Sequence, residues 1–163
     1  MKTNDNLKTA FEGECKAYMK YIAFARAAEN KGRGRIAKLF RAIAEAEKIH
    51  ALNHFVVMGG SSSVEQNISS AIDSETYEFT QMYPAFIQQA EQDSNSRAAA
   101  SFRGASAVEK IHNGLLNDAL GSLGRNREED YYVCTACGNT VPGGLPDKCT
   151  VCGAASDRFR FVE

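Results

Sequence analysis

Apolar residues recur at intervals of three and four over four long segments of the chain. This period places apolar side chains on one face of a helix, so it predicts helices over about 7–29, 36–58, 68–91 and 97–123. In the second helix it places Leu39, Ile43 and Ile49 inward. Polar or glycine-containing segments at 30–35, 59–67 and 92–96 separate the helices. Pro84 lies inside the third, so we expect a kink just before it.

The pattern changes after Gly124. Residues 125–130 are almost all charged and are typical of a hinge between domains. Beyond them, residues 131–133 and 159–162 alternate in the manner of strands, and glycine and proline punctuate the middle. About 33 residues cannot build an adequate hydrophobic core alone, so a metal must stabilise this piece. We therefore expect a helical domain at 1–124, a hinge at 125–130 and a small β-rich domain at 131–163.

Two copies of one tetrapeptide, Glu-Lys-Ile-His, lie inside the second and fourth predicted helices, at 47–50 and 109–112. On a helix, positions i and i+3 share a face, so each Glu and His can reach one metal centre. A single copy is usually a solvated ion pair. Here, however, Glu14 lies 33 positions before Glu47, and Glu75 lies 34 before Glu109. The chain thus repeats a two-helix unit that carries three metal-ligand side chains.

Paired Glu-x-x-His motifs, each with one further inward Glu, are the ligand set of bundle-core di-iron sites. The predicted ligands are Glu14, Glu47, His50, Glu75, Glu109 and His112. Glu78 is an additional carboxylate, three residues after Glu75. Five carboxylates suit an oxidised iron pair better than a reduced one, which accepts imidazole more readily. We hypothesise that one iron exchanges Glu78 for His50 on reduction.

Four of the five cysteines form two Cys-x-x-Cys pairs in the C-terminal segment: Cys134, Cys137, Cys149 and Cys152. Cysteines at this spacing indicate a metal site rather than disulfides. Four thiolates in a tetrahedron suit zinc or iron, and the spacing alone does not choose between a structural zinc ribbon and an iron centre. We interpret the remaining Cys15 as a buried, inert thiol.

Charge and hydropathy narrow the choice of partners. The formal net charge of −1 over 163 residues gives no basic surface for nucleic acid. No apolar run approaches the roughly 18 residues needed to span a bilayer, and the N-terminus lacks a signal-peptide profile. We therefore expect no membrane partner and a cytoplasmic protein. The chain also lacks a nucleotide-binding fingerprint, so electrons must arrive from a separate donor.

These motifs together resemble the rubrerythrin family, and the resemblance covers essentially the whole chain. It rests on FEGE at 11–14, AEAEKIH at 44–50, ETYE at 75–78, MYP at 82–84, EKIH at 109–112 and the two cysteine pairs. The resemblance implies a ferritin-like all-α four-helix bundle with two non-haem irons, followed by a rubredoxin-like domain with one iron on four cysteines. Thr150 stands where the family usually has proline, which removes no ligand.

By the same resemblance, the site residues take individual roles. Glu14 and Glu75 match terminal ligands, and Glu47 and Glu109 match bridging carboxylates. The constant histidine matches His112, the redox-dependent pair matches Glu78 and His50, and the tyrosines near the cluster match Tyr21 and Tyr83.

The activity implied by the resemblance is that of a peroxidase in oxidative-stress defence. It reduces hydrogen peroxide to water with electrons from an external reductase or rubredoxin that enter through the rubredoxin-like iron. Two alternatives stay open: a di-iron oxidase or ferroxidase that uses oxygen, and a non-catalytic redox sensor.

The segment 59–67 is short for a connection that must return along the bundle. To bring Glu47 and Glu75 to one level it must climb about 26 Å and step sideways about 10 Å between helices. Nine residues reach only about 30–32 Å when fully extended. We therefore predict a homodimer in which helices 7–29 and 36–58 of one chain pack with helices 68–91 and 97–123 of the other.

Overall fold

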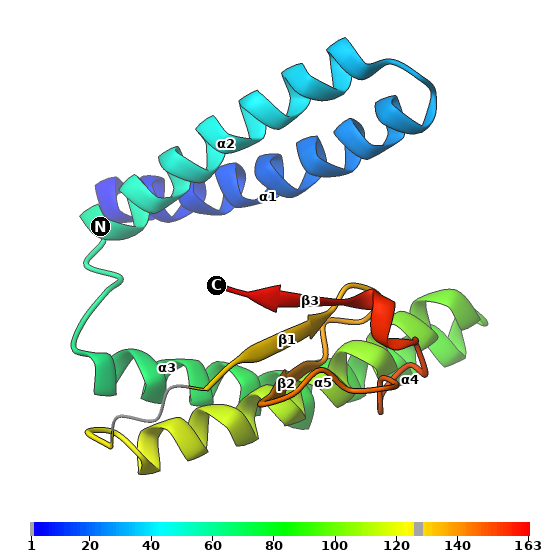
Figure 1. Ribbon diagram of the computed structural model, residues 1–163. Coiled ribbons are helices and arrows are strands. Elements are labelled where there is room, and N and C mark those ends of the chain that lie inside the picture. The colour runs from blue at the N-terminus through cyan, green and yellow to red at the C-terminus, as the bar shows by residue number, and fades with distance from the viewer. Residues whose placement is uncertain (1, 126–128) are drawn as a thin grey trace. The chain divides into compact units, whose positions relative to one another are not determined.

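The computed structural model describes residues 2–125 and 129–163. The chain divides into two compact units, Met1–Ser62 and Ser63–Glu163, which are described separately below (Figure 1). Residues 126–128 of the predicted hinge lie outside the described residues. No helix in the described ranges combines the length and the apolar character needed to cross a membrane.

The first unit is a helical hairpin of α1 (Lys2–Asn30) and α2 (Gly34–Val57). Gly32 adopts a φ of +66° in the connecting turn, a conformation that glycine accepts without strain. Both helices begin before the predicted positions, α1 at residue 2 and α2 at residue 34. The hairpin was otherwise predicted correctly.

Small residues line the seam of this hairpin. The buried residues of α2 are Ala37, Ala44 and Ala51, seven residues apart, and α1 buries Ala25. Alanine lets two helices approach closely, so it occupies the contact line. Leu39 and Ile49, which were predicted to face the bundle interior, are each 55% exposed in this hairpin. Their side chains lie off the alanine seam.

The second unit begins with α3 (Val64–Tyr77), four residues earlier than predicted. The cause is a capping box. The Ser63 hydroxyl accepts a hydrogen bond from the Gln66 backbone N–H at 3.3 Å, and the Gln66 side chain accepts one from the Ser63 N–H at 3.3 Å. Residues 58–63, six in all, therefore connect α2 to α3. The predicted nine-residue connection was too long.

The third predicted helix consists of α3, a π-helical segment η1 (Glu78–Met82) and α4 (Tyr83–Gln92). The Tyr83 N–H donates to the Glu78 carbonyl, five residues back. Pro84 has no N–H, and its ring would clash with a carbonyl in a regular α-turn. The wide π-turn just before Pro84 is how the helix accommodates it, in place of the simple kink that was predicted.

The helix α5 (Ser96–Gly121) completes a second hairpin that repeats details of the first. Arg41 pairs with Glu29 at 3.2 Å, and the corresponding Arg103 pairs with Glu91 at 2.5 Å. Each hairpin also holds one tyrosine and two phenylalanines in contact. These ring clusters are Tyr21, Phe24 and Phe40 in the first hairpin and Tyr83, Phe86 and Phe102 in the second. The repeat inferred from metal-ligand motifs therefore extends to packing.

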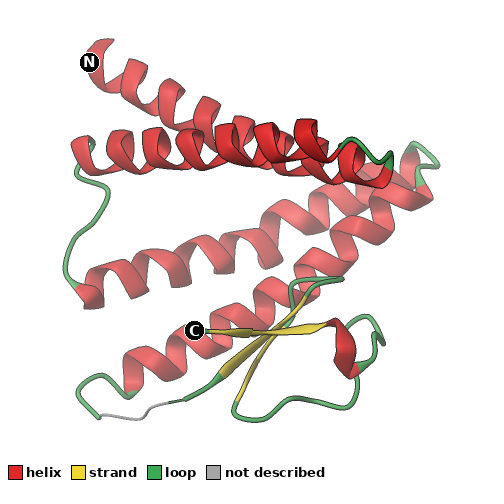
Figure 2. Ribbon diagram, turned by 45° about the horizontal axis from the view of Figure 1, so that its top comes forward, coloured by secondary structure: helices red, strands yellow, loops and turns green. Residues whose placement is uncertain are grey.

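The described residues 129–163 form a three-stranded antiparallel sheet in the order β2-β1-β3, with a short 3₁₀ helix η2 (Ser156–Arg158) (Figure 2). The strands are β1 (Tyr131–Cys134), β2 (Thr140–Pro142) and β3 (Phe159–Val162). The strands predicted at 131–133 and 159–162 are confirmed, whereas β2 was not predicted. Tyr132 pairs with Phe161, their ring centroids 5.6 Å apart. This sheet contacts α5 through β2. The predicted fold class, helical with a small C-terminal β-rich domain, is confirmed.

Candidate metal centres

The first hairpin brings together Glu14, Glu47 and His50. One ligand atom from each lies within 4.8 Å of the others. The Glu47 Oε2 atom is 3.1 Å from His50 Nδ1, and the Glu47 side chain is 17% exposed while that of His50 is 55% exposed. Two carboxylates and one imidazole at this separation make half of a di-iron ligand set.

The second hairpin brings together Glu75, Glu109 and His112 in the same way, also within 4.8 Å. His112 Nδ1 lies 2.8 Å from Glu109 Oε2 and 3.9 Å from Glu75 Oε1. Burial raises the pKa of Glu75, and the negative charge of Glu109 raises it further, while His112 opposes both. Two close, partly buried carboxylates repel each other, and a cation between them would remove that cost.

Glu78 is not part of either three-residue group within the described residues. It is the first residue of the π-helical segment, and its Oε1 accepts a hydrogen bond from the Ser74 hydroxyl at 3.5 Å. Its charge nevertheless helps to raise the pKa of Glu75. Glu78 is therefore near the second group without belonging to it.

Tyr21 and Tyr83 lie in the equivalent ring clusters of the two hairpins. The Tyr21 centroid is 6.0 Å from that of Phe40, and the Tyr83 centroid is 6.2 Å from that of Phe102. Burial raises the pKa of Tyr83, and the charges of Glu78, Glu109 and Glu75 raise it further. The Tyr83 phenol is therefore close to these three carboxylates.

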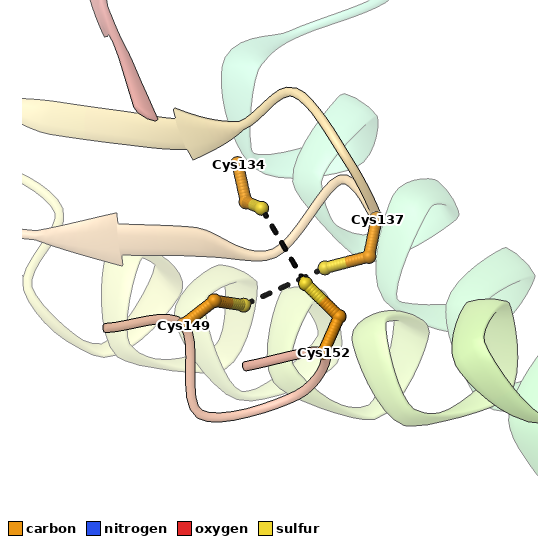
Figure 3. A group of neighbouring side chains, drawn as sticks. All are labelled: Cys134, Cys137, Cys149 and Cys152. Carbon is orange, nitrogen blue, oxygen red and sulfur yellow. Dashed lines mark hydrogen bonds between the residues drawn. The ribbon is translucent and has the colours of Figure 1, made fainter. Parts of the chain in front are cut away.

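The four cysteines of the C-terminal sheet converge (Figure 3). The sulfurs of Cys134 and Cys152 are 3.8 Å apart, and those of Cys137 and Cys149 are 3.6 Å apart. A tetrahedron with metal–sulfur bonds of about 2.3 Å has edges of about 3.8 Å. The cysteine geometry thus fits a tetrahedral ion. Gly138, with φ +86°, and Gly153, with φ +75°, close the two turns.

Asn139 belongs to this centre, although the sequence analysis did not single it out. Its side chain is 1% exposed, and Nδ2 donates a hydrogen bond to Cys149 Sγ at 3.6 Å. Its backbone also hydrogen-bonds Cys137 and lowers that thiol's pKa, but burial outweighs this and raises the pKa to about 12. Burial also acts to raise the pKa of Cys149. There, however, hydrogen bonds from the backbones of Cys152 and Val151 outweigh burial, and the pKa is lowered to about 6. Amide donors thus favour thiolates here.

Thr140 was also missed by the sequence analysis. Its Oγ1 lies 3.1 Å from Nε2 of His112, so the cysteine domain touches the second carboxylate group within one unit. The same hydroxyl donates to the Gly138 carbonyl at 3.3 Å. No sequence signal marks this contact, because it depends on how the turn after Cys137 lies against α5.

Comparison with known proteins tests the family suggested by these centres. The sequence profile of the family described as Rubrerythrin matches residues 5–120. The chain belongs to the rubrerythrin family. Two rubrerythrin-family relatives align over almost all of the chain. Rubrerythrin-2 of Clostridium acetobutylicum is 35% identical and covers 97% of this chain and 95% of its own length. Nigerythrin of Nitratidesulfovibrio vulgaris is 33% identical, and the alignment covers 96% of this chain and 85% of nigerythrin.

Solved structures of nigerythrin are similar to this rubrerythrin-family chain. The mixed-valence and fully reduced, all-ferrous forms each match with a TM-score of 0.61 and 32% identity, over 98% of this chain and 86% of the other. The cofactors follow from membership and from the donors present. The carboxylate and histidine groups hold two non-haem irons, and the four cysteines hold one iron. The iron alternative at the cysteines is thereby favoured over zinc.

Proposed function

We propose that this protein is a peroxidase that reduces hydrogen peroxide to water in oxidative-stress defence. Each turnover consumes one peroxide, two electrons and two protons and yields two waters. When bound, two ferrous ions supply the two electrons that break the O–O bond, and each becomes ferric. Cys134, Cys137, Cys149 and Cys152 would hold the iron that returns electrons to the pair one at a time. An external reductase or rubredoxin refills that centre, and we place the protein in the cytoplasm.

The observation that carries the proposal is the contact between the cysteine domain and His112. An oxidase or ferroxidase that only needs the carboxylate site gains little from a one-electron centre in the adjoining domain. Here the residue three positions after Cys137 hydrogen-bonds a ligand of the other site. That arrangement suits an enzyme whose carboxylate site must be reduced again after each turnover.

The protein's own residues take complementary parts in this proposal. Glu14 and Glu75 would each hold one iron, and Glu47 and Glu109 would be shared between the two. Glu78, held by Ser74 outside the three-residue group, would take the place of the exposed His50 as a ligand of the oxidised pair.

The two ring clusters supply the remaining parts of the site. We propose that their phenylalanines exclude water from one side of the ligands in the assembled bundle. Tyr21 and Tyr83 each carry a phenolic O–H, which we propose donates a hydrogen bond to the bound peroxide.

The assembly we propose is a homodimer that exchanges hairpins. In the ferritin-like order, α2 and α3 run parallel, so their connection must return along the bundle. From Glu47 to the end of α2 is about 15 Å of helix, and from the start of α3 to Glu75 is about 16 Å. The six connecting residues allow seven Cα steps between Val57 and Val64, about 25 Å when fully extended. A climb of about 31 Å exceeds that reach.

Exposed apolar side chains support the same assembly. On α2, Ile49, Leu52 and Val56 share a face and are 55%, 57% and 68% exposed. A row of such residues on one helix needs a covering surface. We infer that α3 and α5 of a second copy provide it. The six ligands of one iron pair then come from two chains.

The test of the activity is anaerobic rapid mixing. The iron-loaded protein is fully reduced and mixed with hydrogen peroxide or with oxygen, while the visible absorbance of the oxidised four-cysteine iron is followed. A peroxidase regains that colour much faster with peroxide. Equal or faster recovery with oxygen would establish an oxidase or ferroxidase instead. Steady-state consumption of peroxide with a supplied reductant separates an enzyme from a slow redox sensor.

A further inference from the structure

His112 is held from both sides of its ring. Nδ1 faces the carboxylate group, 2.8 Å from Glu109 Oε2, and Nε2 lies 3.1 Å from Thr140 Oγ1. A hydroxyl has one hydrogen to donate, and that of Thr140 goes to the Gly138 carbonyl. Thr140 must then accept, so the His112 Nε2 carries the proton. The lone pair of a neutral imidazole then lies on Nδ1, and since a carboxylate cannot donate a proton, the 2.8 Å contact with Glu109 requires a cation between the two atoms.

The same contacts make a continuous path between the two centres. Gly138 follows Cys137 in the chain, its carbonyl accepts the Thr140 hydrogen bond, and Thr140 accepts the His112 N–H. Two hydrogen bonds and a few covalent bonds thus join a cysteine ligand to a histidine ligand. The turn also approaches α5 at a second point, since a Cβ built at Gly138 would lie 3.8 Å from the Val108 side chain. The Thr140 hydroxyl is therefore not the only group that places this turn against α5.

We propose that Thr140 is a positioning residue with two effects. It fixes His112 in the tautomer and orientation that bind metal through Nδ1, and it completes the path by which electrons pass between the centres. Partners on the second ring nitrogen of a ligating histidine commonly change metal affinity by about 10–100-fold. The electron-path half of this inference rests on the proposed function, whereas the affinity half does not.

The test compares Thr140→Val, which keeps the shape and removes the hydroxyl, with Thr140→Ser, which keeps the hydroxyl. Thr135→Val is the matched control, since the Thr135 hydroxyl donates to the Arg158 carbonyl within the same domain and makes no described contact with His112. An unchanged visible spectrum of the four-cysteine iron shows that each variant has folded. Ferrous affinity of the carboxylate site is measured by anaerobic titration, and the ring tautomer by ¹⁵N NMR of protein that holds zinc at the four cysteines only.

We expect Thr140→Val to weaken ferrous binding at least tenfold and to lose the Nε2–H signal of His112, while Thr140→Ser and Thr135→Val stay within about threefold of the parent. At saturating iron, Thr140→Val should also slow recovery of the cysteine-centre colour about tenfold. Equal affinity and an unchanged tautomer in Thr140→Val would overturn the positioning role. Normal affinity with a normal recovery rate would overturn both roles.

A failure of the proposed function is recognisable separately. In that case the parent protein itself shows no preference for peroxide, while the affinity and tautomer differences among the variants persist. Should Thr140→Val lose affinity yet recover its colour at the parent rate under saturating iron, the electron-path role is overturned and the positioning role stands.

Discussion

Glu75 and Tyr83 are eight residues apart, one more than Glu14 and Tyr21 in the other hairpin, yet the two tyrosines occupy equivalent ring clusters. The π-helical segment between Glu75 and Tyr83 takes up the extra residue. It also explains why Glu75 and Glu109 are 34 positions apart, whereas Glu14 and Glu47 are 33 positions apart. An inserted residue would otherwise rotate Tyr83 by about 100° around the helix, away from its partners.

Deletion of Gln81 should therefore convert this segment to a regular α-helix with Pro84 in its interior. We expect a loss of about 3 kcal/mol in the free energy of unfolding, since proline in such a position clashes with the preceding turn. Combining the deletion with Pro84→Ala should recover most of that loss. The free energy of unfolding of all four members of this double-mutant cycle is measured by denaturant unfolding of the metal-free protein, at one fixed protein concentration. Additive effects would show that the π-turn and Pro84 are unrelated.

The exchanged dimer predicts complementation between two inactive chains. One chain carries Glu47→Ala and His50→Ala, and the other carries Glu109→Ala and His112→Ala. In an exchanged dimer of the two, one bundle joins both intact hairpins and the other joins both damaged ones. We expect the mixture, after unfolding and refolding together, to regain tightly bound iron pairs, while each variant alone regains none.

The control for this experiment is a mixture of each damaged chain with itself under the same protocol. A bundle made from a single chain would give no recovery in any mixture, and a stable monomer with an intact iron pair would likewise contradict the exchange.

Asn139 should raise the reduction potential of the four-cysteine iron. Hydrogen bonds to cysteine sulfur stabilise the more negative, reduced form. Asn139→Leu keeps a similar volume and removes the bond to Cys149. We expect a midpoint potential lower by several tens of millivolts, of the order of the 59 mV that corresponds to a tenfold one-electron equilibrium. Spectroelectrochemical titration measures the change. An equal or higher potential would contradict this role, and Thr135→Val should leave the potential unaltered.

Tyr83 should make stability fall in alkaline solution. Burial, and then the neighbouring carboxylates, raise its pKa above the model-peptide value of 10.0. The folded state therefore holds the phenolic proton after the unfolded state has lost it. The stabilising contribution of this phenol is complete below pH 10 and is lost as the pH rises through the folded-state pKa.

The variant Tyr83→Phe should show a shallower loss of stability above pH 10, measured by denaturant unfolding at several pH values. In the absorbance titration of phenolate, Tyr83→Phe should remove the component that ionises at the highest pH. Tyr77→Phe, at a tyrosine that is 53% exposed, should retain that component. If the two substitutions give the same titration, Tyr83 lacks the raised pKa.

The sequence predicted the features that depend on spacing along a helix or a turn. Glu47 and His50 lie on one face because they are three residues apart, and the cysteine pairs converge because each sits on a tight turn. Family membership and the iron cofactors follow from the same motifs. The individual ligand roles, including those of Glu78 and His50, stay predictions.

Other features could be recognised only from the three-dimensional structure. Asn139 and Thr140 act through contacts that no periodicity encodes. The Asn139 contact depends on how the two cysteine turns face each other, and the Thr140 contact depends on the turn after Cys137 packing against α5. The sequence also did not show that the alanine seam, rather than the larger apolar stripe with Leu39 and Ile49, forms the hairpin contact. By contrast, the start of α3 could have been predicted from the sequence, because Ser63 and Gln66 match the pattern of a capping box.

The alanine seam of α2 has a consequence for how the protein is made. Since Ala37, Ala44 and Ala51 occupy the contact line, the larger apolar side chains of the hairpin point elsewhere and stay uncovered in a lone chain. A newly synthesised copy that has not bound a second one exposes an apolar surface that favours non-specific association. If the protein forms the proposed exchanged dimer, the time that a copy stays single is set by its rate of encounter with a second copy. Copies that remain single too long are then expected to aggregate or to bind chaperones.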